Sequence, residues 1–171
     1  TRKVDTVVLD KTGTVTAGRM TVVDVVAAGE TNLGESREVR RIPADASELR
    51  ADLRTSDAEA SAARAGLLRR AGALENASEH PIGRAIARAA AADGPVPDVD
   101  GFQSVPGLGV SGIVEGHAVI VGRAALLHEW AVPVPDDLAS AAAEAEASGR
   151  TAVLVAWDGA ARGVLVVSDE L

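Results

Sequence analysis

The sequence predicts an α+β fold, with an antiparallel β-sheet of about six strands flanked by two helical hairpins. One observation is the order of the segments, which runs strands, two helices, strands, two helices, strands. Another is a pair of tight turns, Glu115-Gly116 and Asp158-Gly159, each lying between two short β-rich runs. The third observation is that the apolar run before Asp10 is followed directly by a polar turn with a glycine, which predicts that the chain also contains a fragment of an α/β domain.

Strands are expected where short runs are rich in β-branched residues, and helices where capping signals precede an apolar stripe. The expected strands cover residues 4–9, 21–28, 102–105, 110–114, 118–121, 152–157 and 162–167. The first helix opens at the capping box Ser56-Asp57-Ala58-Glu59 and ends near Asn76. The others cover 81–92, with Pro81 in the first turn, then 123–130, and a stretch capped by Asp136 or Asp137 that ends at Ser148-Gly149.

Residues 30–56 differ from the rest of the chain. They hold six acids and five arginines, with Gly34 and Pro43 and no clear apolar period. Such a segment buries too little apolar surface to offset the entropy of ordering it. We therefore expect a solvated loop or a partly disordered insertion, with a charged docking arm as the functional alternative.

Composition excludes several classes of function. The 171 residues suffice for one domain, or one domain plus a fragment. A net charge of −8 argues against a nucleic-acid or anionic-membrane surface, and the absence of cysteine excludes disulfide and zinc-thiolate sites within it. No apolar run has the length of a membrane helix, and no signal peptide is visible. Because the sequence opens on Thr1 and stops at Leu171 just after a strand-like run, we expect a piece of a longer protein.

The segment that runs from Val7 to Thr16 carries the first chemical motif. Asp10 stands at the expected carboxyl end of a buried strand, followed by the cation of Lys11, the hydroxyls of Thr12 and Thr14, and Gly13 for the turn. A nucleophile, a positive charge and several donors in a small space suit a phosphoryl group.

The run Asp-Lys-Thr-Gly-Thr-Val-Thr at residues 10–16 resembles the phosphorylation motif of P-type ATPases. The resemblance implies that Asp10 accepts the γ-phosphate of ATP, beside Lys11, and that Asp10 and the Thr12 carbonyl help to hold Mg²⁺. Related phosphatases of the haloacid-dehalogenase-like superfamily carry an aspartate, as general acid/base, where this chain has Thr12. Threonine cannot perform that proton transfer, so the phosphoenzyme should hydrolyse slowly.

A second group of motifs lies further along the chain: Glu75 with Ser78-Glu79-His80-Pro81, the Gly107-Leu108-Gly109 turn, and Gly122-Arg123. Alone, each is weak, because a histidine before proline is usually a surface or capping residue and a Gly-x-Gly is usually a turn. Together with the Asp10 motif they resemble the nucleotide-binding domain of heavy-metal-transporting, type IB, copper-pump-like P-type ATPases.

This resemblance implies a role for each residue. Glu75 would hydrogen-bond the adenine, His80 would orient the nucleotide, and Gly107 and Gly109 would let the backbone approach it. Gly122 matches the glycine of a Gly-Asn pair in the family, whereas Arg123 departs from the asparagine and has the alternative of contacting phosphate. His117 and His128 are expected to be surface residues.

The resemblance divides the chain into an edge of a phosphorylation domain (1–19), a nucleotide-binding domain (20–167) and a return segment (168–171). The expected partners are ATP or ADP and the remaining phosphorylation, actuator and transmembrane domains of one pump, with no nucleic acid. The fragment should be monomeric, bind ATP without turnover, and lie on the cytoplasmic side of a bacterial plasma membrane. Copper is the expected transported metal only because it is frequent among pumps of this class. A free-standing haloacid-dehalogenase-like phosphatase and a non-catalytic nucleotide-binding module are the alternatives.

Overall fold

The structure is a computed structural model that describes residues 19–29 and 46–169. The expected strand over 4–9 and the whole Asp10 motif, with Lys11 and Thr12, lie outside these ranges. The described helices include no candidate membrane span, since the longest of them is rich in charged residues.

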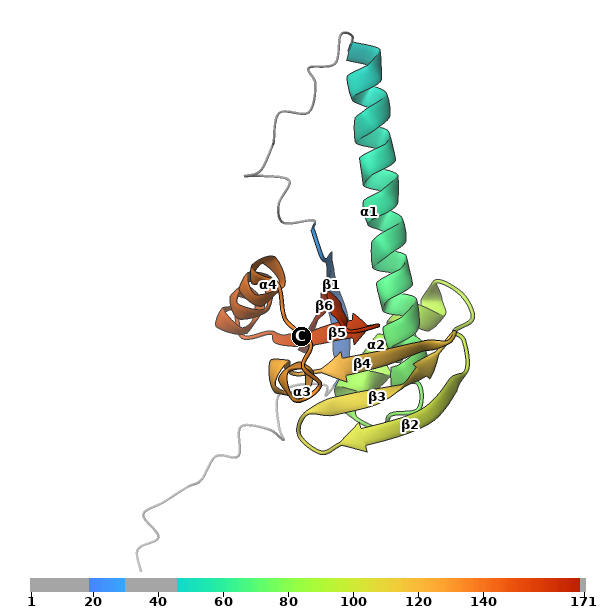
Figure 1. Cartoon of the computed structure of the whole chain (residues 1–171), viewed down its shortest axis with the longest axis vertical. Coiled ribbons are helices and arrows are strands. Elements are labelled where there is room, and N and C mark those ends of the chain that lie inside the picture. The colour runs from blue at the N-terminus through green and yellow to red at the C-terminus, as the bar shows by residue number, and fades with distance from the viewer. Residues whose placement is uncertain (1–18, 30–45, 170–171) are drawn as a thin grey trace, which may run out of the picture.

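The described residues form one six-stranded sheet in the order β1-β6-β5-β4-β3-β2 (Figure 1). Every neighbouring pair is antiparallel, which confirms the predicted sheet. The strands are β1 (Met20–Ala27), β2 (Val99–Val105), β3 (Gly109–Val114), β4 (His117–Gly122), β5 (Thr151–Trp157) and β6 (Ala160–Asp169). β6 continues past residue 167, so the expected domain boundary there falls inside a strand that pairs Asp169 with Met20.

Four described helices cover the two faces of the sheet: α1 (Ala46–Glu75), α2 (Pro81–Ala92), α3 (Ala124–Glu129) and α4 (Asp136–Ala147). Alternate residues of a strand point to opposite faces. On β5, Val153 and Val155 pack with α1 and α2, whereas Leu154 and Ala156 pack with α3 and α4. Because both faces are covered, β5 and β6 are nearly continuous apolar runs instead of alternating ones.

The start of α1 differs from the prediction. The helix begins at Ala46, so the capping box expected at Ser56 is wrong, and the loop expected over 30–56 is wrong from residue 46 onward. Figure 1 shows the first half of α1 extending away from the sheet, and the side chains of residues 57–59 and 61–65 are exposed. The prediction relied on an apolar stripe. The first turns of α1 instead follow from intrinsic helix propensity, because alanine, leucine, arginine and glutamate all favour a helix.

The start of α4 also differs. Its N-cap residue is Pro135, whose side chain makes no capping hydrogen bond, so the cap expected at Asp136 or Asp137 is wrong. Both acids lie in the first turn instead, where a negative charge interacts favourably with the helix dipole. Asp137 has a further role, since one of its carboxylate oxygens accepts a 2.9 Å hydrogen bond from the Gly29 backbone N–H after β1.

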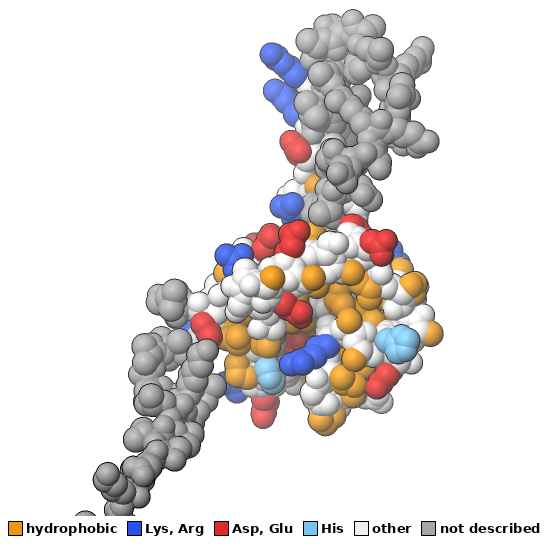
Figure 2. Space-filling view, turned by 90° about the vertical axis from the view of Figure 1, so that its left-hand side faces the viewer, with side chains coloured by type: hydrophobic (Ala, Val, Ile, Leu, Met, Phe, Trp, Pro, Cys, Tyr) orange, Lys and Arg blue, Asp and Glu red, His pale blue; other side chains and the backbone are white. Residues whose placement is uncertain are grey.

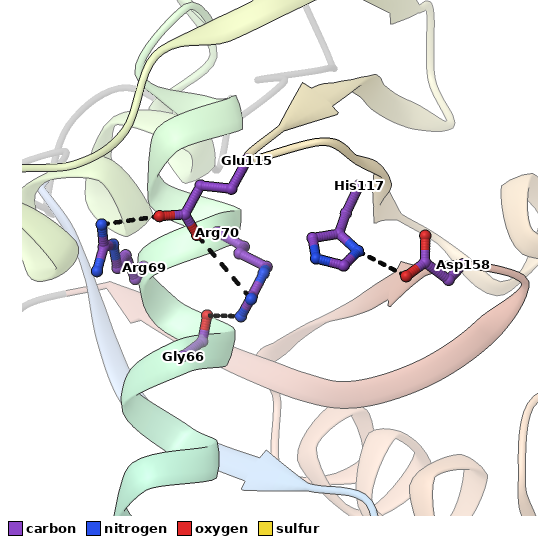
Figure 3. Close-up of polar contacts among 6 residues, drawn as sticks. All are labelled: Gly66, Arg69, Arg70, Glu115, His117 and Asp158. Atoms are coloured by element: carbon purple, nitrogen blue, oxygen red, sulfur yellow. Dashed lines mark hydrogen bonds and ion pairs between the residues drawn. The ribbon is translucent and has the colours of Figure 1, made fainter.

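The two predicted tight turns are confirmed, because Glu115-Gly116 and Asp158-Gly159 both have two successive positive φ angles. They lie at the same end of the sheet, where His117 and Asp158 form a 2.6 Å contact (Figure 3). Arg69 of α1 also contacts Glu115 at 2.9 Å. These groups are partly exposed, so each ion pair contributes at most about 1 kcal/mol. This end of the sheet is opposite the candidate site.

Candidate functional site

A cleft of about 800 Å³ lies where the α1–α2 turn, the loop before β3, the end of β4 and α4 meet. It forms because β4 ends at Gly122, opposite Leu154, whereas Thr151–Val153 of β5 continue beyond that end without β4 beside them. Hydrophobic side chains gather on the face of the body that carries α3 and α4, with separate charged groups between them (Figure 2). The cleft is lined by all six binding residues predicted from sequence: Glu75, His80, Gly107, Gly109, Gly122 and Arg123.

Glu75 is the last residue of α1 and only 6% exposed. Burial raises the pKa of its carboxyl group from 4.5 to about 7, although a hydrogen bond with the Ser78 side chain acts in the opposite direction. The carboxylate lies against the first turn of α2, where a Cβ added to Gly83 would be 2.3 Å from Oε2 of Glu75. The acid is therefore held between a turn and a helix, at the inner end of the cleft.

His80 is exposed and is the N-cap residue of α2. Its Nδ1 accepts a 3.3 Å hydrogen bond from the Ile82 backbone N–H, and the backbone N–H of His80 donates to the Ser78 hydroxyl at 3.2 Å. The capping role that this histidine could have on sequence grounds is thus present. Since Nδ1 accepts, the neutral ring carries its proton on Nε2, which leaves one donor for a ligand.

Gly109 and Gly122 face each other across the β3–β4 ladder. A Cβ on Gly109 would lie 2.2 Å from the Val121 carbonyl oxygen, and one on Gly122 would lie 2.3 Å from the Leu108 carbonyl oxygen. Both positions therefore need glycine for the packing of the chain itself. Gly107 differs, because its φ of +75° requires glycine-like freedom while its Cβ position is open within 4 Å.

Arg123 leaves the end of β4 and is exposed at the mouth of the cleft. Its backbone N–H donates to the Leu108 carbonyl at 2.8 Å, which ties the start of α3 to the glycine loop. Its guanidinium forms no ion pair with any residue that the structure describes. The side chain is thus placed to meet an anionic group of a ligand.

The lining outside the motifs is mostly apolar. It includes residues of α4 and β5 that sequence reasoning did not assign to the site, among them Ala139, Ala142, Ala143 and Val153. The ionisable side chains around the cleft are Glu75, His80, Arg123, Glu146 and Arg150. A cavity with apolar walls and a few directed polar groups suits a flat ring system held by one or two hydrogen bonds.

Gly83 is the positioning residue that the sequence analysis missed. Glycine inside a helix costs about 1 kcal/mol relative to alanine, so its presence in the first turn of α2 was the available signal. The predicted catalytic residues Asp10, Lys11 and Thr12 lie outside the described residues, so the structure does not place them relative to the cleft.

Solved structures define the fold class. The crystal structure of the N-domain of HMA6, a copper-transporting P-type ATPase, matches with a TM-score of 0.59 at 20% identity, covering 88% of this chain and 99% of that one. The crystal structure of a zinc-transporting PIB-type ATPase matches with a TM-score of 0.64 at 24% identity, over 95% of this chain and 21% of its own. The fold is therefore that of the N-domain of these ATPases.

A family profile described as haloacid dehalogenase-like hydrolase matches residues 4–171, and the chain belongs to that family. It is 41% identical over 169 residues to the "Probable copper-exporting P-type ATPase V" of Mycobacterium tuberculosis (strain ATCC 25618 / H37Rv), which covers 98% of this chain and 18% of that protein. It is 35% identical to the cation-transporting P-type ATPase B of Mycobacterium bovis (strain ATCC BAA-935 / AF2122/97), over 99% of this chain and 19% of that protein. The chain thus spans less than a fifth of these relatives, and the resemblance to heavy-metal P-type ATPases inferred from the motifs is confirmed.

Proposed function

We propose that this chain is the ATP-binding part of a heavy-metal-transporting P-type ATPase. One observation carries the proposal: six residues chosen from three separate motifs, between positions 75 and 123, line a single cleft of about 800 Å³. The names of the relatives, which include a silver exporting P-type ATPase of Salmonella typhimurium at 32% identity, support a metal pump as the whole protein. Copper remains our choice of metal, and the relatives named for copper favour it.

In this proposal the adenine enters the inner, apolar part of the cleft and meets the Glu75 carboxyl group. His80 donates from Nε2 toward the nucleotide, and the open backbone at Gly107 allows close approach. Arg123, at the mouth, contacts the phosphates. Few charges face the ligand, so most of the binding energy comes from the base.

In this proposal, phosphoryl transfer takes place at the motif of residues 10–16. The Asp10 carboxylate attacks the γ-phosphorus, the bond to the bridging oxygen breaks, and ADP leaves. Mg²⁺, which neutralises charge on the phosphates, would be held by Asp10 and the Thr12 carbonyl. Among the residues that the structure describes, no group of three His, Cys, Asp or Glu side chains could hold a metal ion.

The proposed division keeps 1–19 and 168–171 with the phosphorylation domain and 20–167 with the nucleotide domain. The pairing of Met20 with Asp169 supports this division. The two points at which the chain passes between the proposed domains then lie side by side, at one end of the β1–β6 pair. The remaining phosphorylation, actuator and transmembrane domains of the pump are the expected partners, and the cytoplasmic side of the membrane is the expected location.

Calorimetric titration of this chain with ATP, ADP, AMP and GTP tests the proposal. We expect ATP to bind with a Kd of about 0.1–1 mM, equivalent to about 4–5.5 kcal/mol, AMP to bind nearly as well, and GTP to bind more weakly. Arg69→Ala, which removes an exposed cation at the far end of the sheet, is the control and should leave the titration unchanged.

The same chain by itself should form no lasting phosphoenzyme with γ-labelled ATP, because the resemblance assigns further Mg²⁺ ligands and a phosphate-binding lysine to the remaining part of the phosphorylation domain. It should not hydrolyse p-nitrophenyl phosphate either, since Thr12 replaces the general acid of the phosphatases. Absence of any nucleotide binding, or phosphatase turnover that is lost in Asp10→Asn, would contradict the proposed function and favour one of the alternatives.

A further inference from the structure

The Glu75 carboxyl group occupies a fixed place in the cleft. A Cβ on Gly83 would lie 2.3 Å from its Oε2 and 2.8 Å from the Ser78 hydroxyl, so neither group could remain where it is beside alanine. The side chain is almost completely buried, and it lines the cleft. This carboxyl group therefore meets the ligand in one orientation.

No cation of the described residues lies within ion-pair distance of the Glu75 carboxyl group. The ionisable groups facing this region are Glu79 and His80 from the α1–α2 turn, Arg84 and Arg88 from α2, Arg123 from the end of β4, Glu146 from α4 and Arg150 before β5. Within the described residues, none of them forms an ion pair with Glu75. A buried acid without a cationic partner is favoured in its neutral form.

The two forms of a carboxyl group match different bases. A neutral carboxyl group presents one O–H donor beside one acceptor, which complements the N1 acceptor and the N6 amine of adenine. An ionised carboxylate presents two acceptors, which complement the N1–H and the N2 amine of guanine. A site that offers the wrong form leaves polar groups unpaired, and this discriminates strongly between ligands.

We propose that Glu75, held in place by Gly83 and Ser78, meets adenine as the neutral acid, so that the protonation of this carboxyl group sets the preference of the cleft between adenine and guanine. This inference rests on the proposed function, because it requires the cleft to bind a nucleotide. The proton on one carboxyl group then selects the base, and binding of ATP at alkaline pH takes up one proton from solvent.

The size of the effect follows from the carboxyl pKa of about 7. The neutral fraction falls from about nine-tenths at pH 6 to about one-tenth at pH 8, so ATP affinity should fall about tenfold over that range. Preference for ATP over GTP should fall at least as much, because the ionised form gains acceptors that suit guanine.

Glu75→Gln is the decisive variant. The amide has nearly the same shape as the neutral acid and keeps one donor and one acceptor, but it does not titrate. We expect calorimetry to give ATP affinity within about threefold of the wild-type value at pH 6, retained at pH 8. The ATP phosphates and all other groups of the chain are the same in both proteins, so the difference between their pH profiles isolates Glu75.

Gly83→Ala tests the positioning, with Gly66→Ala as the matched control, since a Cβ there would make only an ordinary 3.4 Å contact with Arg70. Gly83→Ala should lose most of the discrimination between ATP and GTP, whereas Gly66→Ala should keep it. Circular dichroism under the same conditions establishes that each variant is folded.

The outcomes separate the two proposals. Binding of ATP by the wild type with the same affinity from pH 6 to pH 8, together with loss of ATP binding in Glu75→Gln, would show that the ionised carboxylate is the ligand and would overturn this inference alone. Failure of the folded wild type to bind either nucleotide at any pH would overturn the proposed function, and this inference with it.

Discussion

Replacing Glu75 with glutamine should stabilise this domain at alkaline pH, although it removes a residue of the candidate site. The carboxyl pKa is about 7 in the folded chain against an ordinary value of 4.5, mainly because burial penalises the charged form. The folded state therefore binds the proton more tightly than the unfolded state. Stability from this group is fully present below pH 4.5 and is lost as the pH rises to about 7.

The magnitude follows from those two values. Each pH unit between them removes about 1.4 kcal/mol, so the carboxyl group costs about 2 kcal/mol at pH 6 and about 3 kcal/mol at pH 8. A domain of this size is stable by about 5–15 kcal/mol, so the effect is large enough to measure. Glutamine has nearly the same shape as the neutral acid and avoids the loss.

Urea unfolding of both proteins at pH 4.5, 6 and 8 is the assay. The stability difference in favour of Glu75→Gln should grow from less than about 1 kcal/mol at pH 4.5 to about 3 kcal/mol at pH 8. Glu79→Gln alters an exposed acid four residues away and should change stability by no more than about 0.5 kcal/mol. A difference between Glu75→Gln and wild type that stays constant with pH would refute the reasoning.

Two further comparisons separate structural roles from ligand roles. His80→Ala should cost about 1 kcal/mol of unfolding free energy through loss of the helix cap and should weaken ATP several-fold, whereas His80→Asn keeps a capping side chain and should affect only ATP, as urea unfolding and calorimetry would report. Equal loss of stability in both His80 variants would contradict the capping assignment. Gly109→Ala should cost about 2–5 kcal/mol, because it adds a backbone clash to an unfavourable φ, while Gly107→Ala should cost about 1–2 kcal/mol from φ alone. Similar costs at the two glycines in urea unfolding would show that the contact with the Val121 carbonyl does not matter.

The sheet could be predicted from sequence because its strands are short β-branched runs joined by turns with strong signals. Glu115-Gly116 and Asp158-Gly159 fix the registers of two hairpins, and both turns have the positive φ angles that such pairs favour. The start of α1 could not be found in the same way. An apolar stripe marks only the part of a helix that packs, and residues 57–59 and 61–65 of α1 are exposed.

The site was predictable in its residues but not in its shape. Glu75 and His80 belong to motifs that family resemblance makes visible, whereas Ala139 and Ala142 of α4 carry no chemical signal and join the cleft only through the fold. For Gly109, the sequence could suggest that a ligand approaches the backbone closely. It could not show that β4 already lies against this glycine.

The 30-residue helix α1, about 45 Å long, has two halves with different relations to the rest of the chain. Its inner half is fixed from Leu67 to Glu75 by buried contacts, whereas the side chains of residues 57–59 and 61–65 are exposed. Opening of the exposed turns therefore costs less free energy than opening of the inner half and leaves the cleft unchanged. Lengthening or shortening α1 before Ser56 by whole helical turns should therefore leave the Glu75 carboxyl group at the other end in place.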